Sequence, residues 1–245
     1  MIGERDSRTA KLLGEEAVAV LNGKHVAVFG IGGVGGFVCE GLSRAGIGAL
    51  DLVDSDVVSP SNLNRQLIAL TSTVGRKKTE VMAQRIRDIR PETAVRTFDL
   101  FYLPETADRI DLSEYDYIVD AIDTVAGKIA LAEGAKRMGV PLIAAMGAGN
   151  RLDPTRFRVT DLFKTSGCPL ARVMRRELKK RGIEELKVVF SDEPALKPLE
   201  RPEDEGSNKR AVPGSVSFVP SVMGLILAGE VVKDLLRAEG LLDGK

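Results

Sequence analysis

The sequence has no tryptophan, and aromatic residues make up only 4% of it. Modules that stack RNA bases on aromatic side chains are therefore not favoured. Charge is balanced as well, with 35 Lys plus Arg against 35 Asp plus Glu. Zero net charge argues against a protein that coats nucleic acid, although it leaves room for a local basic patch.

Long apolar stretches are also absent. No run approaches the roughly 18 residues that a membrane span needs. The first residues, MIGERDSRTAKLLGEE, are charged from Glu4 onward and contain no apolar signal core, which argues against secretion. We therefore expect a cytoplasmic protein that does not associate with membranes.

Cysteine and histidine are scarce, with only Cys39, Cys168 and His25 in the chain. Two cysteines exclude a disulfide scaffold and a four-cysteine zinc site. We expect Cys39 to pack in a helix and His25 to be structural, so catalysis by histidine is not expected. Cys168 keeps two interpretations, packing or function, because it lies beside a helix N-terminus that can lower a thiol pKa.

What is present is a globular composition, 44% hydrophobic over 245 residues. Apolar runs predict strands at 25–29, 49–53, 95–98, 117–119 and 141–145, with helices at 33–45, 76–90 and 126–138. Parallel strands need long crossovers, which the intervening helices provide. The predicted fold class is a doubly wound, Rossmann-like α/β sheet that is mostly parallel, with an N-terminal helix at 8–21.

The pattern changes after Gly147. Strands are expected at 157–160 and 188–190, and helices at 169–181 and 221–237. Residues 192–213 lack periodicity and are rich in Glu, Asp, Pro, Lys and Gly, which predicts a mobile loop. We expect a single domain over 1–245, with a core at 1–147 and an extension at 148–245.

A glycine-rich turn follows the first expected strand. Gly30, Gly32 and Gly35 match the pattern G-x-G-x-x-G, and Gly33 adds a fourth glycine. Such glycines permit a tight turn, the approach of a phosphate and close helix packing, and the helix N-terminus attracts anions. Asp54 ends the second strand, where a carboxylate accepts hydrogen bonds from ribose hydroxyls. The motif favours nucleotide binding over packing alone, but it does not separate a dinucleotide from ATP.

Cations and amides after the second strand favour ATP. The segment SNLNRQ contains Asn62 and Arg65, and GRKK contains Lys77 and Lys78. Several cations at one crevice suit a triphosphate, whose charge exceeds that of a pyrophosphate bridge. Chemistry alone does not separate Lys77 from Lys78, and Arg65 and Lys78 keep the alternative of solvated surface charges.

Two carboxylates, Asp120 and Asp123, lie at the end of the fourth strand. Ligands bind at the carboxyl ends of parallel strands, and one carboxylate there suits a magnesium ion that bridges phosphate oxygens. Asp123 is the better candidate because it lies past the strand. Asp120 keeps the alternative of capping the following turn.

Four segments in this order and spacing, GIGGVGG, DSDVVSPSNLNRQ, VGRKK and DAIDT, resemble the ubiquitin-activating-enzyme-like adenylyltransferases that include ThiF, MoeB and HesA. The later segments GVPLIAAMGAGNRLDPTRFRVTDLFKTSGCPLARVMRREL and GSVSFVPSVMGLILAGEVV are similar to the branch of tRNA threonylcarbamoyladenosine dehydratases, also called TcdA or CsdL. The chain lacks the paired C-x-x-C zinc motifs that the thiamine and molybdopterin members usually carry.

The resemblance implies a role for individual residues. Family dimers place an N-terminal arginine in the partner's ATP site, for which Arg8 is our candidate and Arg5 the fallback. The spacing from Gly75 selects Lys78 over Lys77. The implied site consists of Gly30, Gly32, Gly33 and Gly35 around the phosphates, Asp54 on the ribose, Asn62, Arg65 and Lys78 on the triphosphate, and Asp123 on magnesium.

The implied reaction is adenylation of the carboxylate of threonylcarbamoyladenosine in tRNA, followed by ring closure with net loss of water. The implied cofactors are ATP and Mg²⁺, and no zinc is implied. The implied assembly is a homodimer, and in each chain the extension at 148–245 is expected to face the substrate. Ten Lys or Arg against three acids in 151–181 support an RNA substrate, with a solvated helix face as the alternative. Requirements for a monovalent cation or a sulfur-relay protein stay open.

Three other functions compete with the dehydratase. The main alternative is an enzyme that activates the C-terminus of a ubiquitin-like sulfur-carrier protein, which predicts a zinc site and a hydrophobic surface that docks the carrier protein. A nicotinamide-dependent oxidoreductase is disfavoured by Arg65 and Lys78. A non-catalytic nucleotide-binding partner is disfavoured by the presence of Asp123 and Arg65.

Overall fold

The protein is described by a computed structural model over residues 3–197, 199 and 213–242. One seven-stranded sheet forms its centre. All seven expected strands are present, and their ends differ from the prediction by at most one residue. The strands are β1 His25–Phe29, β2 Ala49–Val53, β3 Ala94–Phe98, β4 Tyr117–Asp120, β5 Leu142–Ala145, β6 Phe157–Asp161 and β7 Lys187–Ser191.

The strand order is β3-β2-β1-β4-β5-β7-β6. All neighbouring pairs are parallel except β6 with β7, which is antiparallel. In the centre, Val26 of β1 pairs with Leu50 of β2 on one side and with Tyr117 of β4 on the other. The chain therefore reverses its direction of travel across the sheet at β1 and β4, and such a reversal opens a crevice at the carboxyl ends of the strands.

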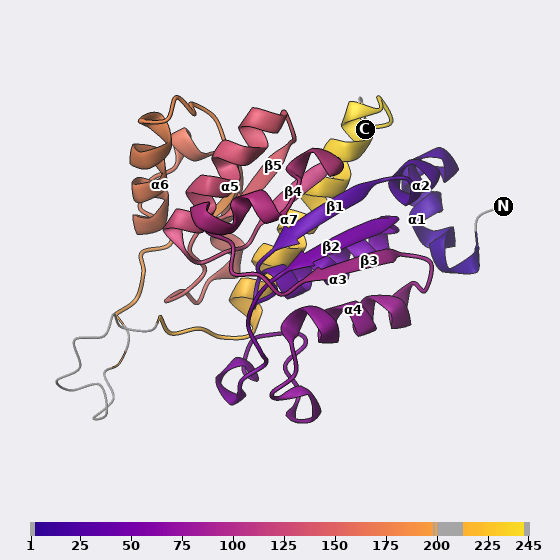
Figure 1. The fold of residues 1–245 in the computed structure, drawn as a ribbon, viewed down its shortest axis with the longest axis horizontal. Helices are drawn as coiled ribbons and strands as arrows, with labels where there is room; N and C mark the ends of the chain where they lie inside the picture. Colours follow the sequence, from indigo (N-terminus) through magenta and orange to yellow (C-terminus); the bar gives the residue numbers. More distant parts are fainter. Residues whose placement is uncertain (1–2, 198, 200–212, 243–245) are drawn as a thin grey trace.

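Helices cover both faces of the sheet (Figure 1). Helices α2, α3, α4 and α7 pack over one apolar cluster, while α5 and α6 pack over two clusters that involve the opposite face. The chain thus forms three layers, with the confirmed α/β architecture. The helices are α1 Ser7–Leu13, α2 Glu15–Asn22, α3 Gly35–Ala45, α4 Lys78–Ile89, α5 Val125–Met138, α6 Pro169–Lys179 and α7 Phe218–Ala238.

The predicted helix at 8–21 is wrong in one respect, because Gly14 divides it into α1 and α2. The Gly14 N–H still bonds the Ala10 carbonyl at 2.8 Å, but its φ of 100° is a conformation that glycine adopts readily and other residues rarely adopt. Helix α2 buries Ala17, Val18 and Leu21, whereas α1 buries no residue. The N-terminal segment therefore consists of two helices, and only the second, α2, contributes side chains to the core.

The C-terminal half keeps the predicted elements. Helix α7 starts three residues earlier than expected, with Pro220 in its first turn, where a missing N–H costs little. The expected loop at 192–213 lies largely outside the described residues, so its mobility stays a prediction. In the described ranges, none of the helices has the length and apolarity that a bilayer crossing requires.

Candidate functional site

A pocket of about 420 Å³ occupies the crevice at the carboxyl ends of the strands. Its walls are formed by the segments that follow β1, β2, β3, β4 and β5, together with the starts of α4 and α7. Neither Gly35 nor Arg8 lines it. The predicted site residues that do line it are Gly30, Gly32, Gly33, Asp54, Asn62, Arg65, Lys78 and Asp123.

The glycines of the turn divide into two kinds. Gly30 has φ of 88°, and a Cβ there would lie 2.6 Å from the carbonyl oxygen of Ala121. A Cβ on Gly35 would lie 1.7 Å from the carbonyl oxygen of Gly30. At Gly32, by contrast, the nearest described atom is Nε2 of Gln66 at 3.8 Å. Gly30 and Gly35 therefore hold the turn against β4 and α3, while Gly32 leaves room on the pocket side.

Asp54 joins the end of β2 to the glycine turn. Its Oδ2 accepts a hydrogen bond from the Ile31 N–H at 2.6 Å, and its Oδ1 accepts one from the Asp56 N–H at 2.8 Å. Burial raises the pKa of this carboxyl, an effect that the nearby Lys78 opposes. The carboxylate is thus fixed in the pocket wall by backbone donors before any ligand binds.

The structure separates Lys78 from Lys77. Lys78 is the first residue of α4, its side chain is 6% exposed, and its Nζ donates to Asp56 Oδ2 at 2.6 Å. Lys77 forms an ion pair with Asp99 at 2.9 Å and does not line the pocket. Of the two lysines, Lys78 is therefore the one that lines the pocket.

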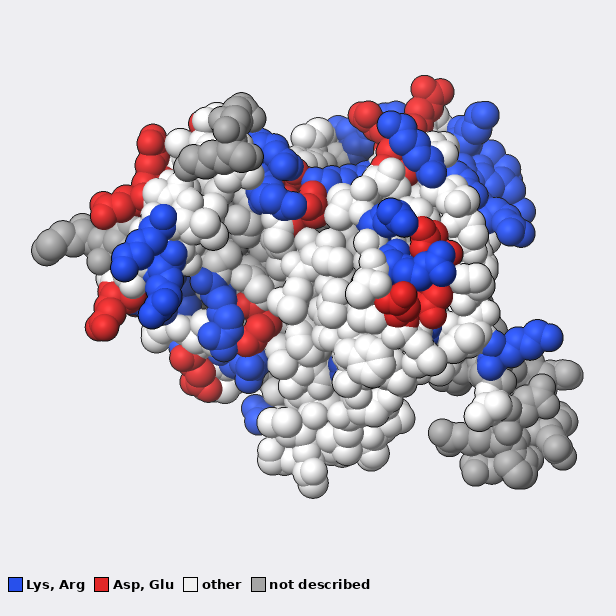
Figure 2. Space-filling view, turned by 180° about the vertical axis from the view of Figure 1, so that it is seen from behind, with Lys and Arg blue, Asp and Glu red and all other residues white. Residues whose placement is uncertain are grey.

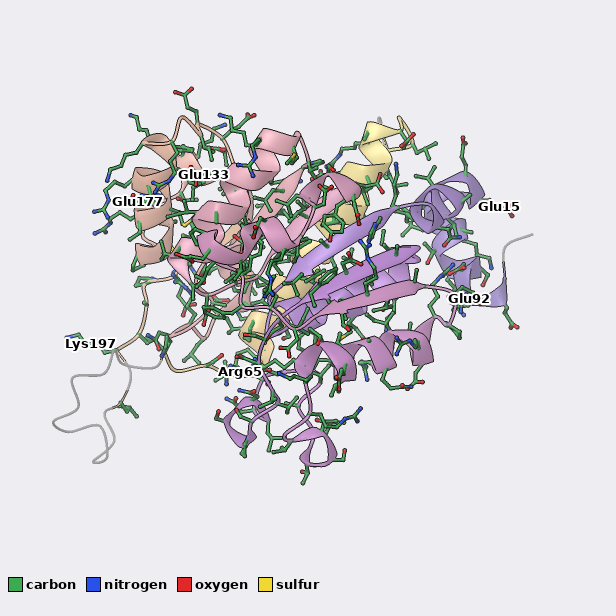
Figure 3. All side chains as sticks on the ribbon, viewed as in Figure 1. Glu15, Arg65, Glu92, Glu133, Glu177 and Lys197 are labelled. Carbon is green, nitrogen blue, oxygen red and sulfur yellow. The ribbon has the colours of Figure 1, made fainter. Side chains whose placement is uncertain are left out.

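Asn62 and Arg65 come from the loop between β2 and α4, and both line the pocket. Arg65 is labelled near the lower centre of Figure 3. Asn62 is buried, and its Oδ1 accepts from the Ser59 N–H at 3.1 Å in a capping box. Arg65 Nη1 donates to the Ser61 carbonyl at 2.9 Å and to Asn64 Oδ1 at 3.0 Å. Because its partners are neutral, the Arg65 charge is uncompensated by any described carboxylate.

The two carboxylates after β4 have different environments. Asp123 is exposed and lines the pocket, and no hydrogen bond or ion pair of its carboxylate occurs within the described part of the chain. Asp120 is fully buried, and its Oδ1 accepts from the Ile122 N–H at 3.1 Å and from Lys128 Nζ at 3.0 Å. The turn-capping interpretation of Asp120 is the one that the structure supports.

Several pocket residues were missed by sequence reasoning. Gln66 is 7% exposed, and its Oε1 has no hydrogen-bond partner among the described residues. Its position beside Arg65 in SNLNRQ was the only available signal. Leu100, Phe101 and Tyr102 form an apolar wall after β3, for which the run LFYL was the signal. An unpaired amide and an apolar wall are suited to a nucleotide with a polar and an aromatic end.

Asn150 binds two segments that are distant in sequence. Its φ is 59°, its N–H bonds the Gly214 carbonyl at 2.8 Å, and its Oδ1 accepts from the Gly214 N–H at 2.6 Å. Its own carbonyl accepts from the Leu196 N–H at 2.8 Å. Because Gly149 and Gly214 line the pocket, this clasp fixes the wall on the extension side.

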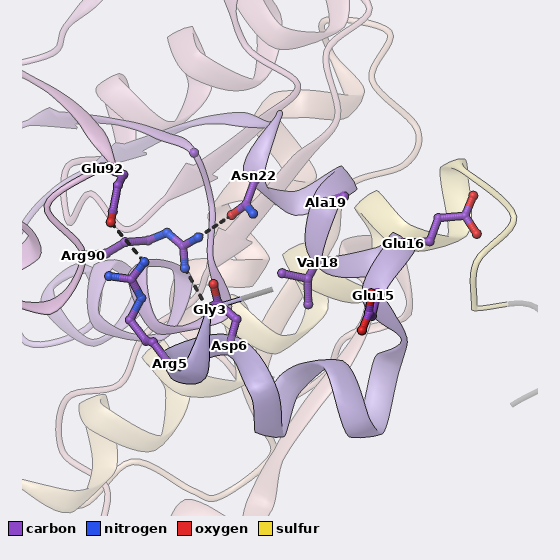
Figure 4. Close-up of a pocket in the computed structure, with 11 residues that line it drawn as sticks. Gly3, Arg5, Asp6, Glu15, Glu16, Val18, Ala19, Asn22, Arg90 and Glu92 are labelled. Atoms are coloured by element: carbon purple, nitrogen blue, oxygen red, sulfur yellow. Dashed lines mark hydrogen bonds and ion pairs between the residues drawn. The ribbon is translucent and has the colours of Figure 1, made fainter. Parts of the chain in front are cut away.

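Arg5 and Arg8 lie elsewhere. A second hollow, of about 810 Å³, opens between the N-terminal helices and the amino ends of the strands (Figure 4). There Arg5 pairs with Glu92 at 3.0 Å, and Arg90 pairs with Asp6 at 2.8 Å. Arg8 follows on α1 and is exposed. In Figure 3, Glu92 lies on the right, near the N-terminal helices, and Arg65 lies near the lower centre. Neither Arg5 nor Arg8 lines the pocket of its own chain.

Helix α6 carries the predicted basic patch, and Lys and Arg side chains gather at that edge in Figure 2. The patch is weaker than its composition suggests, because Arg176, Lys180 and Arg181 all pair with Glu177 and lower its pKa to about 2. Arg175 donates to the Thr165 carbonyl at 2.9 Å. For Arg172 and Lys179 no partner occurs within the described ranges, so they are the patch's available charges.

The scarce residues are structural. Cys39 is buried in α3, where burial raises the pKa of its thiol, and Cys168 is 2% exposed in the cluster beneath α6. His25 Nε2 lies 3.1 Å from Oδ1 of the buried Asp51. Within the described residues, no group of three His, Cys, Asp or Glu side chains is arranged to hold a metal.

With this geometry established, the chain can be compared with known proteins. The sequence profile of the ThiF family matches residues 5–243. The chain belongs to the ThiF family. This ThiF-family chain is 44% identical over 239 residues to tRNA threonylcarbamoyladenosine dehydratase of Bacillus subtilis, a match that covers 94% of each protein.

Two crystal structures of Escherichia coli tRNA N6-threonylcarbamoyladenosine dehydratase, TcdA, are similar to this ThiF-family fold. The complexes with AMP and with ATP give TM-scores of 0.88 and 0.86, at 36% identity and with 98% of both chains covered. The resemblance inferred from the motifs is confirmed, and so is the fold class.

Proposed function

We propose that this protein is an ATP-dependent tRNA threonylcarbamoyladenosine dehydratase that works by adenylating a carboxylate. One observation carries the proposal: a single pocket at the sheet's switch point gathers the glycine turn, Asp54, Arg65, Lys78 and Asp123. Relatives along nearly the whole chain have that name, and one of them was crystallised with ATP. The enzyme is expected to act in the cytoplasm.

The pocket suggests how ATP lies in it. Gly32 and Gly33 leave the backbone accessible to the phosphates at the turn before α3. Asp54 is placed for the ribose, and the wall after β3 for the adenine. Arg65 and Lys78 supply positive charge for the triphosphate, and Asn62 lines the same pocket.

Magnesium fits this site only together with the nucleotide. Asp123 is one exposed carboxylate without a described partner, and Mg²⁺ is commonly held by one or two carboxylates, substrate phosphates and several waters. Asp123 would hold the ion, which would draw charge from the phosphate oxygens when bound. The chain lacks C-x-x-C pairs, so we expect no zinc.

The residues then act mainly by positioning and by charge. The substrate carboxylate oxygen attacks the α-phosphorus of ATP, the bond to the β-phosphate breaks, and pyrophosphate leaves. Arg65 and Lys78 stabilise the charge that develops on the phosphates. A nitrogen or oxygen of the substrate's own side chain then attacks the acyl carbon, and AMP leaves with the carboxyl oxygen. The nucleoside has lost one water, and no enzyme nucleophile is required.

The tRNA would be held from the extension, residues 148–245. Arg172 and Lys179 on α6 are exposed and without described partners, and such cations bind phosphates without reading sequence. The acidic residues Asp192 and Glu193 lie in the same half of the chain, where Asp192 pairs with Arg156 and Arg158. These pairs leave α6 as the basic surface of the extension.

A homodimer would complete the site. Arg8 is exposed on α1, a helix that buries no residue, and it does not reach its own pocket. Val57, Leu63, Leu70 and Val74 leave apolar surface exposed around the loop that carries Arg65, and Figure 2 shows a broad uncharged face. We propose that a second copy covers this apolar face and that Arg8, or Arg5, enters the partner's pocket.

The decisive test is mass spectrometry of tRNA nucleosides after incubation of threonylcarbamoyladenosine-containing tRNA with protein, ATP and Mg²⁺. We expect the nucleoside to lose the mass of one water, and Asp123→Ala to abolish that loss. Asp88→Ala, which removes an exposed carboxylate on α4, is the matched control and should retain activity. A sulfur-relay protein or a monovalent cation can be added to show whether either is required.

The opposite result is equally informative. An unchanged nucleoside, combined with ATP–pyrophosphate exchange that depends on the C-terminus of a ubiquitin-like carrier protein, would replace the dehydratase by a sulfur-carrier adenylyltransferase.

A further inference from the structure

A buried ion pair lies directly beneath the pocket. Lys128 is 0% exposed, as is its partner Asp120, and Lys128 Nζ lies 3.0 Å from Asp120 Oδ1. A lysine almost never becomes fully buried unless it is paired, and removal of one partner of such a pair is strongly destabilising. The mechanism above uses neither residue, although both adjoin the segment that ends in Asp123.

The pair holds both backbone polar groups of one residue, Ile122. Asp120 Oδ1 accepts from the Ile122 N–H at 3.1 Å, and Lys128 Nζ donates to the Ile122 carbonyl at 3.1 Å. Ile122 lines the pocket and immediately precedes Asp123. The two peptide groups on either side of Ile122 are therefore each held by one hydrogen bond, and the one held by Lys128 leads directly into Asp123.

The same turn supports two other walls of the pocket. The Ala121 carbonyl oxygen lies where a Cβ on Gly30 would come within 2.6 Å, so the turn abuts the glycine loop. One turn into α5, a Cβ on Gly127 would lie 2.6 Å from the Tyr102 carbonyl oxygen. A shift of Ile122 would therefore also move the glycine turn at Gly30 and the wall after β3 that contains Tyr102.

We propose that Lys128 is a positioning residue, which acts through the Ile122 carbonyl to hold Asp123 where a metal–nucleotide complex needs it. The inference rests on the proposed function only in taking Asp123 as the magnesium-binding carboxylate. Lys128 touches no ligand itself. Residues that orient a metal ligand in this way commonly change metal affinity or activity by about 10- to 100-fold when they are replaced.

A purely structural role is the competing explanation, since Lys128 also neutralises Asp120. Asp120 Oδ2 has no hydrogen-bond partner among the described residues, so Lys128 is its principal compensation. The two roles separate in a double variant. Asp120→Asn with Lys128→Met removes both charges together and thereby avoids an uncompensated buried carboxylate, but it does not restore the donor to Ile122.

The experiment compares the full-length protein with Lys128→Met, Lys128→Arg and the double variant Asp120→Asn/Lys128→Met. Lys136→Met, on the exposed face of the same helix, is the matched control. Calorimetry measures the dissociation constants of ATP with Mg²⁺, of ATP without metal, and of AMP. Thermal unfolding measures stability, and no tRNA is needed.

We expect Lys128→Met to unfold at lower temperature and the double variant to recover most of that loss. In the double variant, the advantage that Mg²⁺ gives to ATP binding should still fall by about 10- to 100-fold, with AMP affinity changed much less. Lys128→Arg should restore part of the metal effect, because it keeps a cationic donor. Lys136→Met should match the wild type in every measurement.

Two results would overturn the inference. One is a double variant that regains both stability and the full Mg²⁺ effect, which would make Lys128 a counter-charge only. The other is a Lys128→Met variant that folds and binds MgATP normally. If Lys128→Met does not fold, the double variant and Lys128→Arg still decide the question. A nucleoside left unchanged by the wild type would refute the dehydratase and leave this result standing.

Discussion

The two ends of the sheet differ in whether their charged and polar side chains have hydrogen-bond partners within the described part of the chain. Toward the amino end, the buried Asp51 of β2 accepts from the Tyr115 hydroxyl at 2.8 Å and from Arg96 Nη2 at 2.7 Å, and His25, the first residue of β1, lies 3.1 Å away. At the carboxyl end, Asp123 has no described partner and the Gln66 Oε1 is buried without one. One end satisfies its polar groups internally, and the other leaves them available to a ligand.

This contrast explains why the volume of a hollow does not by itself identify the functional site. The larger hollow lies at the amino end, where Arg90 donates to Asp6 and Asn22 and is thereby satisfied. The smaller pocket contains the groups that still need partners. Unsatisfied polar groups in a concave site are therefore the better guide to function here. Variants at each end should separate activity from stability.

After Asp123→Ala, the largest effect on activity is expected from Arg65→Ala. Its guanidinium has only neutral partners, so its loss should cost little stability but remove charge stabilisation from the transition state. We expect kcat to fall by about 100- to 1,000-fold. Nucleoside mass spectrometry at saturating ATP measures it, with Arg87→Ala on α4 as the control. Retention of full activity would remove Arg65 from the mechanism.

Within the glycine turn, Gly35→Ala and Gly32→Ala should have different effects. A Cβ on Gly35 would lie 1.7 Å from the Gly30 carbonyl oxygen, so the backbone must move, at a cost of about 3 kcal/mol or more. At Gly32 the nearest described atom is 3.8 Å away, so the fold should tolerate alanine. Chemical denaturation should show the loss for Gly35→Ala alone, while calorimetry should show weakened ATP binding for both. Equal stability of the two variants would contradict this division.

The amino end should carry stability without activity. Asp51→Asn removes the carboxylate that Arg96 and His25 share, although Arg96 keeps Glu114 as a partner, and we expect a loss of about 2 kcal/mol in the free energy of unfolding. Activity per folded molecule should not change, because the pocket lies at the other end. A parallel fall in kcat would show that the two ends are coupled.

The same residue predicts a pH dependence. Burial alone would raise the pKa of Asp51, but hydrogen bonds from His25, Arg96 and Tyr115 outweigh it and hold the pKa below its ordinary value. The resulting stability is fully present above the unfolded-state pKa of about 3.9 and is lost as the pH falls below it. Thermal unfolding between pH 6 and about pH 3 should therefore decline less steeply for Asp51→Asn than for the wild type.

The smallest effect is expected on α6. Arg172→Glu and Lys179→Glu should each weaken tRNA binding several-fold at low salt and make the salt dependence of binding shallower. Arg176→Glu should do less, because its charge already pairs with Glu177. Filter binding across a salt series tests the order, and an equal effect of all three variants would mean that the ion pairs seen on α6 open when tRNA binds.

The sequence predicted the strands, the fold class and the grouping of eight site residues in one pocket. The periodicity of hydrophobic residues and the turn-forming residues between them can both be read from short segments of the sequence. It did not predict the break at Gly14, because the helical pattern continues across it and only the backbone conformation ends α1. It overestimated the α6 patch, because Glu177 neutralises three cations that a count treats as free.

Lys128 shows a different limit of sequence reasoning. A lysine inside an amphipathic helix is normally assigned to the solvated face, and its partner Asp120 belongs to the preceding strand. Only the crossing of that strand with α5 brings the two charges together in the core. The role of Arg8 stays a prediction for a related reason, since its proposed target lies on another molecule.

The Asn150 clasp has a practical consequence for protein engineering. Because Leu196 and Gly214 both bond to Asn150, the chain leaves the pocket wall and returns to it at one point. In general, each doubling of the length of a flexible loop costs only about 0.6 kcal/mol. An affinity tag or a fluorescent reporter inserted between these two anchors should therefore leave the active site intact and supply the optical signal that a chain without tryptophan lacks.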